Sequence, residues 1–387
     1  MSTQKVYTHA TIFSLSQVLL GVLNYLFQLL LINKLGDVQY GEFLSWYSMI
    51  GLFLVLGSVA QNYSNFQLHD SYWIKKISIF SIFFIFSTFL FLKLLNINNI
   101  NIIGTFYILS SILSGFIFGQ LQGRFYFISL AVLSLLSISF RIAWTLWVDQ
   151  FIIDKLNLLI IAKIILFTHF SALILTNLFA ILKNQSFSHV TKESVASQNK
   201  YRSLLGSFLL SSGAVIYPQL DFMTLVNIND KLQLGHFAQF SMQIRSFYFI
   251  MMILFQVLLP FQIHNKLSLN KILSEKKYSY YYLLVIYICT LVLTFLIYKL
   301  AFISNEIIKY KITFFAILNL FFYVYFFIKI QTFVSLKKIK KAVGLLILTL
   351  LLPFVNYFFL NLNIEIFYLN SFFFNQLIFF GTAHNHD

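Results

Sequence analysis

Long apolar stretches alternate with short polar ones along almost the whole chain. An α-helix rises 1.5 Å per residue and needs about 20 apolar residues to cross a hydrocarbon core about 30 Å thick. The alternating ten-residue strands of an outer-membrane β-barrel do not occur. The pattern therefore predicts an all-α polytopic membrane protein with about twelve transmembrane helices, near residues 9–33, 42–63, 75–95, 102–120, 125–147, 156–182, 203–227, 236–262, 279–298, 312–333, 342–360 and 364–381.

Composition excludes a soluble globular domain. Hydrophobic residues make up 59% of the chain and charged residues only 10%, whereas soluble domains carry about 25% charged residues. The first apolar stretch is too long for the core of a signal peptide, and no small-residue cleavage site follows it, so we expect it to be retained as a helix. The single cysteine, Cys289, lies within a predicted span and is expected to form neither a disulfide nor a metal cluster.

One clearly polar connector, KNQSFSHVTKESVASQNKYR at residues 183–202, follows the sixth predicted span. It divides the predicted helices into two equal sets. We therefore expect an N-terminal six-helix lobe at residues 1–182, a cytoplasmic linker at 183–200 and a C-terminal six-helix lobe at 201–387.

The basic residues predict how the helices are oriented. With the N-terminus in the cytoplasm, 16 of the 27 Lys and Arg residues fall in cytoplasmic segments, 7 in outer loops and 4 within spans. Such a bias toward the cytoplasmic side is the rule for membrane proteins. We therefore expect both termini in the cytoplasm. We attribute the formal net charge of +15 to this topology and to anionic inner-leaflet lipid, and we expect no nucleic-acid partner.

A phrase at the end of the first predicted helix recurs half a chain later. LINKLGDVQYGEF at residues 31–43 matches LVNINDKLQLGHF at residues 225–237 in five of thirteen positions, at an offset of 194 in a chain of 387 residues. In each copy we expect a short polar turn around Asp37 or Asp230 and a new helix just after Gly41 or Gly235, since glycine permits a positive φ or a close backbone approach. The match predicts two repeats related by a pseudo-two-fold axis along the membrane normal, as in transporters whose substrate site lies between repeats. The alternative is that two similar turns coincide by chance.

The same residues resemble the first hairpin of the bacterial polysaccharide flippases, the Wzx-type O-antigen translocases of the MATE-like multidrug, oligosaccharidyl-lipid and polysaccharide transporter superfamily. That hairpin carries a basic residue, Leu-Gly, a few polar residues and Tyr-Gly, which here are Lys34, Leu35, Gly36, Tyr40 and Gly41. The second half is similar over residues 217–260, with an Asp in span seven, a Leu-Gly turn, an Arg in span eight and a Pro at its end. The resemblance covers residues 1–65 and 200–265, and it implies twelve helices in two lobes around a central cavity that opens alternately to each side.

Charged residues within the spans are the candidate functional residues, because a charge inside a bilayer is costly and is usually functional. Four of them are expected in one layer in the outer half of the membrane, about 9 to 13 Å below the outer ends of their helices: Arg141, Lys163, Asp221 and Arg245. The fifth, Lys329, lies near a cytoplasmic helix end, where its side chain can reach water.

One interpretation of this layer is structural. Asp221 and Arg245 would form an ion pair between adjacent helices, and Asp149 and Asp154 could reach down from the adjoining loop toward the other cations. Asp221 could also take part in ion coupling, since Pro218 lies one turn earlier and a kink there would expose backbone carbonyls to Na⁺ or beside a proton site. Ordinary helix bending at Pro218 is the simpler account.

The other interpretation is functional. A buried cation needs a counter-charge or a substrate that supplies one. Arg141, Arg245 and Lys163 would then bind an anionic head group such as pyrophosphate, and the planar guanidinium suits this because it binds phosphate oxygens in pairs. His169, within span six, is expected to be an interhelical hydrogen-bonding residue rather than a proton relay.

Taken together, these features predict a transporter and not an enzyme. The sequence has no glycine-rich phosphate loop, no paired carboxylates and no nucleotide-binding segment. We therefore expect no cofactor and no metal, with transport coupled to H⁺ or Na⁺ or driven by consumption of the product.

The predicted activity is that of a flippase for polyprenyl-pyrophosphate-linked oligosaccharide, an O-antigen or capsule repeat unit of the kind used in lipopolysaccharide biosynthesis. It would work by alternating access in a bacterial inner membrane. The expected partners are this lipid-linked substrate, phospholipid and the polysaccharide polymerase machinery.

Two alternatives stay open. A MATE-type small-molecule antiporter is disfavoured because the spans hold four cations and one anion, and a membrane-embedded O-antigen polymerase or ligase is disfavoured because the outer loops are short.

Overall fold

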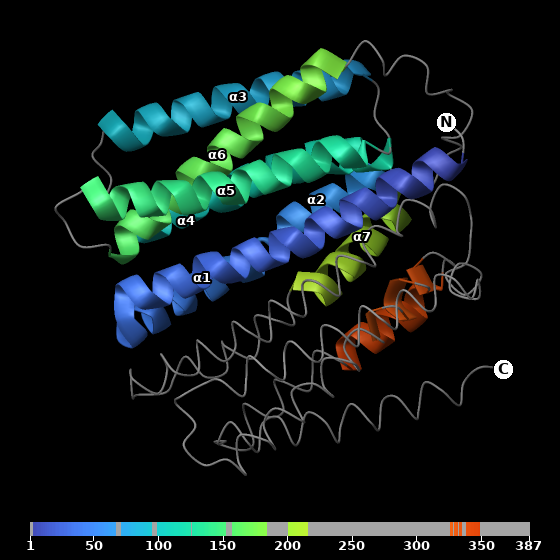
Figure 1. Cartoon of the computed structure of the whole chain (residues 1–387). Helices are drawn as coiled ribbons and strands as arrows, with labels where there is room; N and C mark the ends of the chain where they lie inside the picture. Colours follow the sequence, from blue (N-terminus) through green and yellow to red (C-terminus); the bar gives the residue numbers. More distant parts are fainter. Residues whose placement is uncertain are drawn as a thin grey trace. The chain divides into compact units, whose positions relative to one another are not determined.

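The computed structural model describes most of the first half of the chain and a small part of the second (Figure 1). The described residues are 3–66, 71–94, 99–124, 126–151, 157–183, 200–215, 326–327, 329–331, 333–334 and 338–348. Contacts between Cα atoms divide the chain into two compact units, unit 1 at Met1–Ser211 and unit 2 at Ser212–Asp387. All regular elements in these ranges are helical.

The helices of unit 1 follow the apolar pattern of the sequence. Their bounds are α1 Thr3–Phe53, α2 Val55–Phe66, α3 Ser71–Leu94, α4 Ile100–Gly123, α5 Phe127–Phe151, α6 Leu158–Lys183 and α7 Lys200–Val215. Within the described ranges, five helices are long and apolar enough to cross a membrane, so this is a multi-pass membrane protein. Two helix starts have a clear local cause, because a side-chain oxygen accepts an otherwise unpaired backbone N–H: Asn99 caps α4 and Asn157 caps α6.

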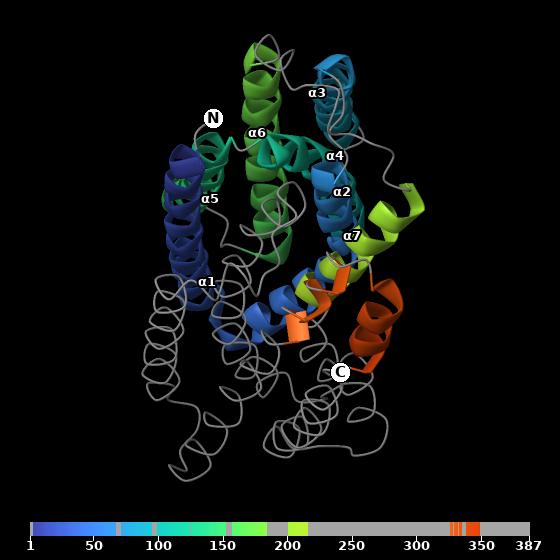
Figure 2. The same cartoon turned by 90° about the vertical axis from the view of Figure 1, so that its right-hand side faces the viewer.

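The first helical segment contains a sharp break at Gly36. The apolar stretch Leu19–Asn65 has 47 residues, which as one straight helix would measure about 70 Å, more than twice the thickness of a bilayer core. Gly36 has φ 70° and ψ 171°, a conformation essentially restricted to glycine. The chain reverses there (Figures 1 and 2), so the stretch makes two crossings. The turn was expected around Asp37, with the returning helix starting just after Gly41. The backbone turns at Gly36, next to Asp37, and Gly41 lies buried within the returning helix.

Helices α1 and α5 lie side by side and run in the same direction (Figures 1 and 2). Phe27 contacts Arg141, and seven residues further along α1 Lys34 contacts Asp149, eight residues further along α5. The two contacts occur in the same order along both helices, so the helices are parallel. This is the direction that alternating crossings require for the first and fifth predicted spans.

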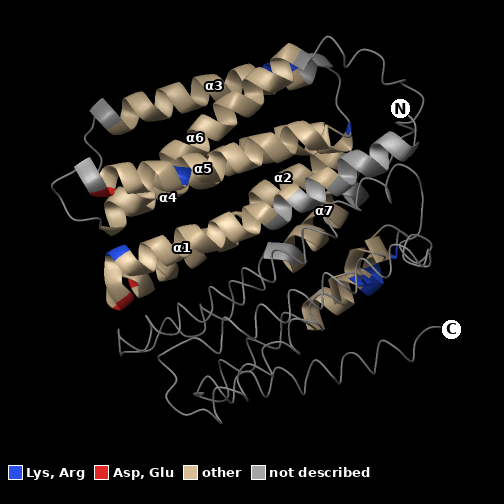
Figure 3. Cartoon of the chain, viewed as in Figure 1, with Lys and Arg blue, Asp and Glu red and all other residues tan. Residues whose placement is uncertain are grey.

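Many of the charged residues lie at the ends of the helices, and the helix middles are largely uncharged (Figure 3). The end of unit 1 that carries the Gly36 turn, termed the Gly36 end, also carries the C-terminal end of α5 and the N-terminal end of α6. There Lys34 Nζ lies 2.6 Å from Asp149 Oδ2, with the two side chains 39% and 26% exposed. A pair this exposed is worth about 0–1 kcal/mol, so it aligns α1 with α5 more than it stabilises them.

Helices α2 and α4 approach closely along a row of small residues. Ser111, Gly115 and Gly119 recur every four residues on α4 and so share one face. A Cβ atom added at Gly115 would lie 2.1 Å from the carbonyl oxygen of Gly57 on α2, and one at Gly119 would lie 2.1 Å from that of Gln61. The two backbones therefore touch, in the small-residue packing that membrane helices use to associate.

Polar side chains cross the same interface. Gln61 Nε2 donates to Gln122 Oε1 at 3.0 Å, and Gln120 Nε2 donates to both the carbonyl and the hydroxyl oxygen of Ser64 at 2.8 Å. Ser64 is fully buried, so the polar face of α2 is turned toward protein. Lipid offers these groups no partner, and pairing with α4 satisfies them.

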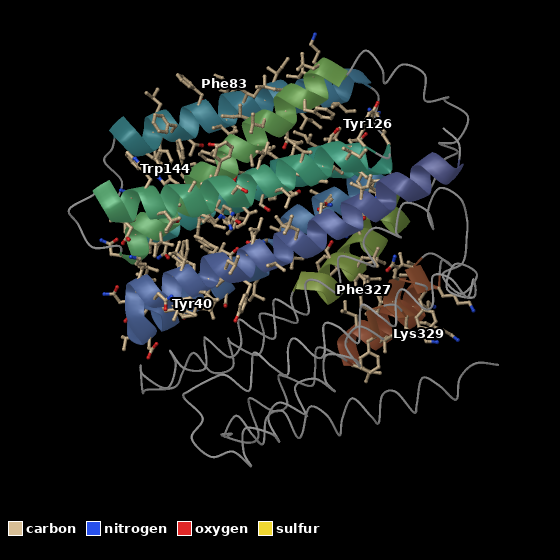
Figure 4. The ribbon with its side chains drawn as sticks, in the orientation of Figure 1. Tyr40, Phe83, Tyr126, Trp144, Phe327 and Lys329 are labelled. Atoms are coloured by element: carbon tan, nitrogen blue, oxygen red, sulfur yellow. The ribbon has the colours of Figure 1, made fainter. Side chains whose placement is uncertain are left out.

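Helix α3 turns large apolar side chains outward. Phe80, Phe83, Phe86 and Phe89 are between 51% and 67% exposed, and Figure 4 shows Phe83 directed away from the other helices. Exposed apolar surface costs about 25 cal/mol per Å² in water, whereas lipid tails solvate it. This face of α3 is therefore a lipid-facing surface.

Helix α7 contributes to both units. In unit 1, Asn62 Nδ2 on α2 donates to Ser211 Oγ at 3.0 Å. In unit 2, a Cβ atom at Gly213 would lie 3.6 Å from side-chain atoms of both Phe327 and Ile330, an ordinary packing distance. Phe327 and Ile330 are buried, so Gly213 lies against a small apolar core of unit 2.

Candidate functional site

Arg141 lies near the middle of a membrane-spanning helix. It is ten residues from the Phe151 end of α5, a helix of 25 residues, and therefore about 15 Å below that end. This is deeper than the 9 Å expected from the sequence, because α5 continues four residues past the predicted end of the fifth span. Its side chain is partly buried and its Nε atom is fully buried.

Aromatic groups surround the guanidinium of Arg141. Its Cζ atom lies 5.7 Å from the centroid of the Phe27 ring on α1, a cation–π contact. The Tyr107 hydroxyl on α4 interacts with the side chains of both Arg141 and Tyr47. On α5 itself, Thr145 Oγ1 donates to the Arg141 carbonyl oxygen at 2.8 Å. The cation is thus held by a ring face and a hydroxyl.

No carboxylate neutralises Arg141 in the part of the chain that the structure describes. Asp149, which in the structural interpretation could reach down from the adjoining loop, lies on α5 and is paired with Lys34 instead. Asp154 lies outside the described residues. The Nε atom of Arg141 has no hydrogen-bond partner among the described groups, so the guanidinium keeps unused donor capacity inside the unit.

His169 on α6 completes the group around Arg141. Its imidazole packs edge-on against the Tyr107 ring with centroids 5.0 Å apart, hydrogen-bonds to the Ser110 backbone, and lies within electrostatic range of Arg141. The imidazole thus makes interhelical contacts between α6 and α4, as expected from its place in the span. Its Nε2 atom is buried and has no partner among the described residues.

These side chains form one layer, termed the Arg141 cluster: Phe27, Tyr47, Tyr107, Arg141 and His169. Residue counts from the Gly36 end place all five between about 10 and 17 Å below it. Sequence reasoning identified Arg141 and considered His169, but it missed the other three. The chain contains 22 Tyr and 48 Phe residues, and nothing in the sequence distinguishes these from the rest.

Lys163 does not join the Arg141 cluster. It is five residues from the start of α6, about 7.5 Å below the Gly36 end, so it is shallower than Arg141 and not in the same layer. It is exposed, and one turn further along α6 lies Phe167, also exposed. Trp144 on α5 packs against Phe167 and Trp147 with ring centroids 5.0 and 5.4 Å apart. Exposed tryptophans near a helix end are typical of a membrane–water interface.

The remaining candidates lie outside the described residues. These are Arg245 and Asp221, with the turn and kink residues Gly235 and Pro218. Their assigned roles stay predictions, as does the superposition of the two halves. Among the described residues, no group of three or more His, Cys, Asp and Glu side chains could hold a metal ion.

Comparison with known proteins identifies the fold. No protein-family model matches the chain, and no curated protein matches it in sequence. Solved structures of MATE transporters share its architecture. A multidrug resistance MATE family transporter of the MOP superfamily, in an outward-facing conformation, has a TM-score of 0.54 at 11% identity and covers 95% of this chain and 92% of its own. The structure of a MATE protein in complex with Br-NRF has a TM-score of 0.59 at 12% sequence identity, and the match covers 96% of this chain and 92% of that one. A eukaryotic MATE transporter has a TM-score of 0.56 at 12% sequence identity, and the match covers 97% of this chain and 96% of that one.

These likenesses extend over nearly the full length of each chain. The protein therefore has the fold of the MATE transporters, in which about twelve helices form two lobes. The predicted fold class is confirmed. Sequence identities of 11–12% carry no information on what is transported.

Proposed function

We propose that this protein is a flippase that moves polyprenyl-pyrophosphate-linked oligosaccharide from the cytoplasmic to the outer face of a bacterial inner membrane. The MATE fold supports a membrane transporter that works by alternating access. The proposed substrate is an O-antigen or capsule repeat unit, whose lipid tail stays in the bilayer while its head group crosses. The polysaccharide polymerase machinery would consume the product on the outer side.

The observation that carries this proposal is the chemistry around Arg141. The Arg141 guanidinium lies near the middle of a membrane helix, with a ring face and a hydroxyl as neighbours, and it has no counter-charge among the described residues. A pyrophosphate supplies that charge. Arginine binds phosphate oxygens in bidentate geometry, and the Phe27 ring holds the guanidinium plane while leaving its N–H groups able to donate. The Tyr107 hydroxyl, which interacts with the Arg141 side chain, lies at the same point.

A small-molecule antiporter is the second candidate, because one structural neighbour is a multidrug resistance transporter. For a cationic cargo the Arg141 cluster would be repulsive, since its permanent charge is positive and no described carboxylate offsets it. An anionic head group removes this conflict. Charge complementarity therefore favours the flippase.

The test is a flipping assay with the purified protein in proteoliposomes. A short polyprenyl-pyrophosphate-linked oligosaccharide is placed in the membrane, and its arrival on the far side is followed with a membrane-impermeant glycosidase. Charge-assisted hydrogen bonds are worth about 1.5–3 kcal/mol, so Arg141→Ala should slow flipping about 10- to 150-fold. Arg141→Lys should recover only part of the rate, because an ammonium cannot make the bidentate contact.

The matched control is Lys75→Ala. It removes one positive charge from an exposed residue in the first two turns of α3, away from the Arg141 cluster, and should flip at the wild-type rate. Equal rates for Arg141→Ala and wild type would overturn the assignment. Transport of organic cations with no flipping of the lipid-linked sugar would favour the antiporter.

Arg245 and Asp221 supply a second test in the other half of the chain. Arg245→Ala should abolish flipping, and Arg245→Lys should restore it in part. If Arg245 binds substrate, a double variant lacking both charges should be as inactive as Arg245→Ala. If Asp221 only neutralises Arg245, the double variant should regain activity, because a single substitution strands a buried charge at a cost of about 3–5 kcal/mol.

A further inference from the structure

His169 has a chemical capacity that the proposed head-group binding does not use. Its Nε2 atom is buried and has no partner among the described residues, while its hydrogen bond to Ser110 and its contact with Tyr107 fix the ring in place. A buried imidazole nitrogen with an open lone pair is a proton acceptor. It lies in the same layer as Arg141, about 15 to 17 Å below the Gly36 end.

The charge of Arg141 controls whether that nitrogen can be protonated. A second positive charge beside a guanidinium, inside a membrane-spanning helix bundle, is unfavourable. Arg141 cannot lose its proton, so His169 is the member of the pair that stays neutral. An anion bound at Arg141 reverses the balance, because it attracts a proton to the neighbouring imidazole.

The groups that face His169 come from each helix packed around it. Tyr107 and the Ser110 backbone face it from α4, Arg141 faces it from α5, and Tyr47 from the returning part of α1 reaches the cluster through Tyr107. The described lysines of α3 lie within the first two turns of that helix, far from this layer: Lys75 and Lys76. In the described part of the chain no acidic residue acts on His169. Its protonation therefore depends on whether Arg141 is neutralised.

We propose that Arg141 and His169 form a coupled site that takes up a pyrophosphate-type anion and a proton together. The proposal rests on anion binding at Arg141, as in the proposed function, and is independent of the sugar. By thermodynamic linkage the coupling is reciprocal. The factor by which the bound anion raises the proton affinity equals the factor by which the bound proton raises the anion affinity. Proton and head group would then travel in the same direction, unlike an exchange mechanism in which proton and cargo compete for one site.

The experiment measures binding of farnesyl pyrophosphate, a short polyprenyl pyrophosphate, to the purified full-length protein in nanodiscs by titration calorimetry. Repeating the titration in buffers of different ionisation enthalpy counts the protons taken up. For the wild type we expect net proton uptake, and an affinity that rises by about 5- to 150-fold between pH 8 and pH 6. This measurement needs no variant, so it does not depend on how well a variant folds.

His169→Asn is the matched variant, because an asparagine amide can keep the hydrogen bond to Ser110 while removing the protonatable nitrogen. The probe's own phosphate titrates in this range, and the difference between wild type and His169→Asn removes that contribution. At pH 8 we expect the variant to bind with the affinity of the wild type, and at lower pH its affinity should change only as far as the probe's own phosphate titrates. Arg141→Gln should bind the probe weakly at every pH.

The two proposals fail in different ways. If His169→Asn binds with the same proton uptake and pH dependence as the wild type while Arg141→Gln does not bind, the coupling is wrong and the anion site stands. If the wild type does not bind farnesyl pyrophosphate, or Arg141→Gln binds it equally well, the anion site itself is wrong and the coupling falls with it.

Discussion

Replacing Gly119 by alanine should separate helices α2 and α4 and destabilise unit 1. The added Cβ would lie 2.1 Å from the backbone oxygen of Gln61 and 2.8 Å from the Cβ of Ser64. An ordinary contact begins at 3.4 Å, so the backbones must move apart by about 1.3 Å. The obstacle is backbone, and no rotamer change can relieve it.

The size of the effect follows from what crosses this interface. Overpacking of this kind costs about 1–3 kcal/mol. The two hydrogen bonds from Gln120 to Ser64, now 2.8 Å long, would stretch to about 4.1 Å and be lost, and each is worth about 0.6 kcal/mol inside a membrane protein. The total is about 2–4 kcal/mol. For a unit of 211 residues this lowers the unfolding midpoint by about 4 to 16 °C.

The assay is thermal unfolding of the purified protein in detergent, followed by tryptophan fluorescence, with two graded controls. For Gly104→Ala, on the same helix, the nearest atoms to the new Cβ all belong to side chains: Ile50 Cδ1 at 2.6 Å, Ile50 Cγ1 at 3.2 Å and Trp46 Cζ2 at 3.7 Å. Side chains can move more easily than backbone, so this variant should shift the midpoint less. Gly344→Ala meets no described atom within 4 Å and should be neutral or stabilising by about 0.5–1 kcal/mol. If Gly119→Ala unfolds at the same temperature as Gly344→Ala, the close backbone approach is not what holds α2 to α4.

Three further predictions concern the turn, the ion pair and the topology. Gly36→Ala should cost about 1–3 kcal/mol through backbone strain alone, since the new Cβ would touch none of the described atoms within 4 Å; an unchanged midpoint would show that the turn relaxes. Lys34→Ala should lower stability by less than about 1 kcal/mol, and less still in 1 M salt, because its ion pair is partly exposed. A fused reporter enzyme should be cytoplasmic after Arg202 and at Asp387, and external near Asp154; the opposite side at any of these sites would contradict the predicted spans.

The architecture could be predicted because the bilayer imposes a simple rule on the sequence. A helix that crosses lipid must be apolar over its whole length, so the helices α3 to α6 lie close to the predicted spans. The position of the turn within the first predicted hairpin was harder to predict. LGDVQYG offers two glycines, and only the backbone dihedrals show that Gly36, and not Gly41, takes the left-handed conformation.

The candidate site could be predicted only in part. Arg141 stands out because charges are rare in spans, yet its partners are ordinary residues of a phenylalanine- and tyrosine-rich chain. Asp149 shows the limit clearly. It lies close enough to Arg141 in the sequence to pair with it, but the parallel packing of α1 on α5 places Lys34 beside Asp149, and these two form the ion pair. Which helices are neighbours is a property of the assembled fold, and no local pattern encodes it.

The parallel contact between α1 and α5 also sets the timing of biogenesis. Phe27 and Arg141 are 114 residues apart in the chain, so at about 5–20 residues per second the ribosome needs about 6 to 23 s to deliver the second partner after the first. During that interval α1 is already in the membrane without its neighbour, and lipid or the insertion machinery must cover the face that later receives α5. The short ion pair at the Gly36 end can form only when α5 is nearly complete, so it reports that the N-terminal bundle has closed.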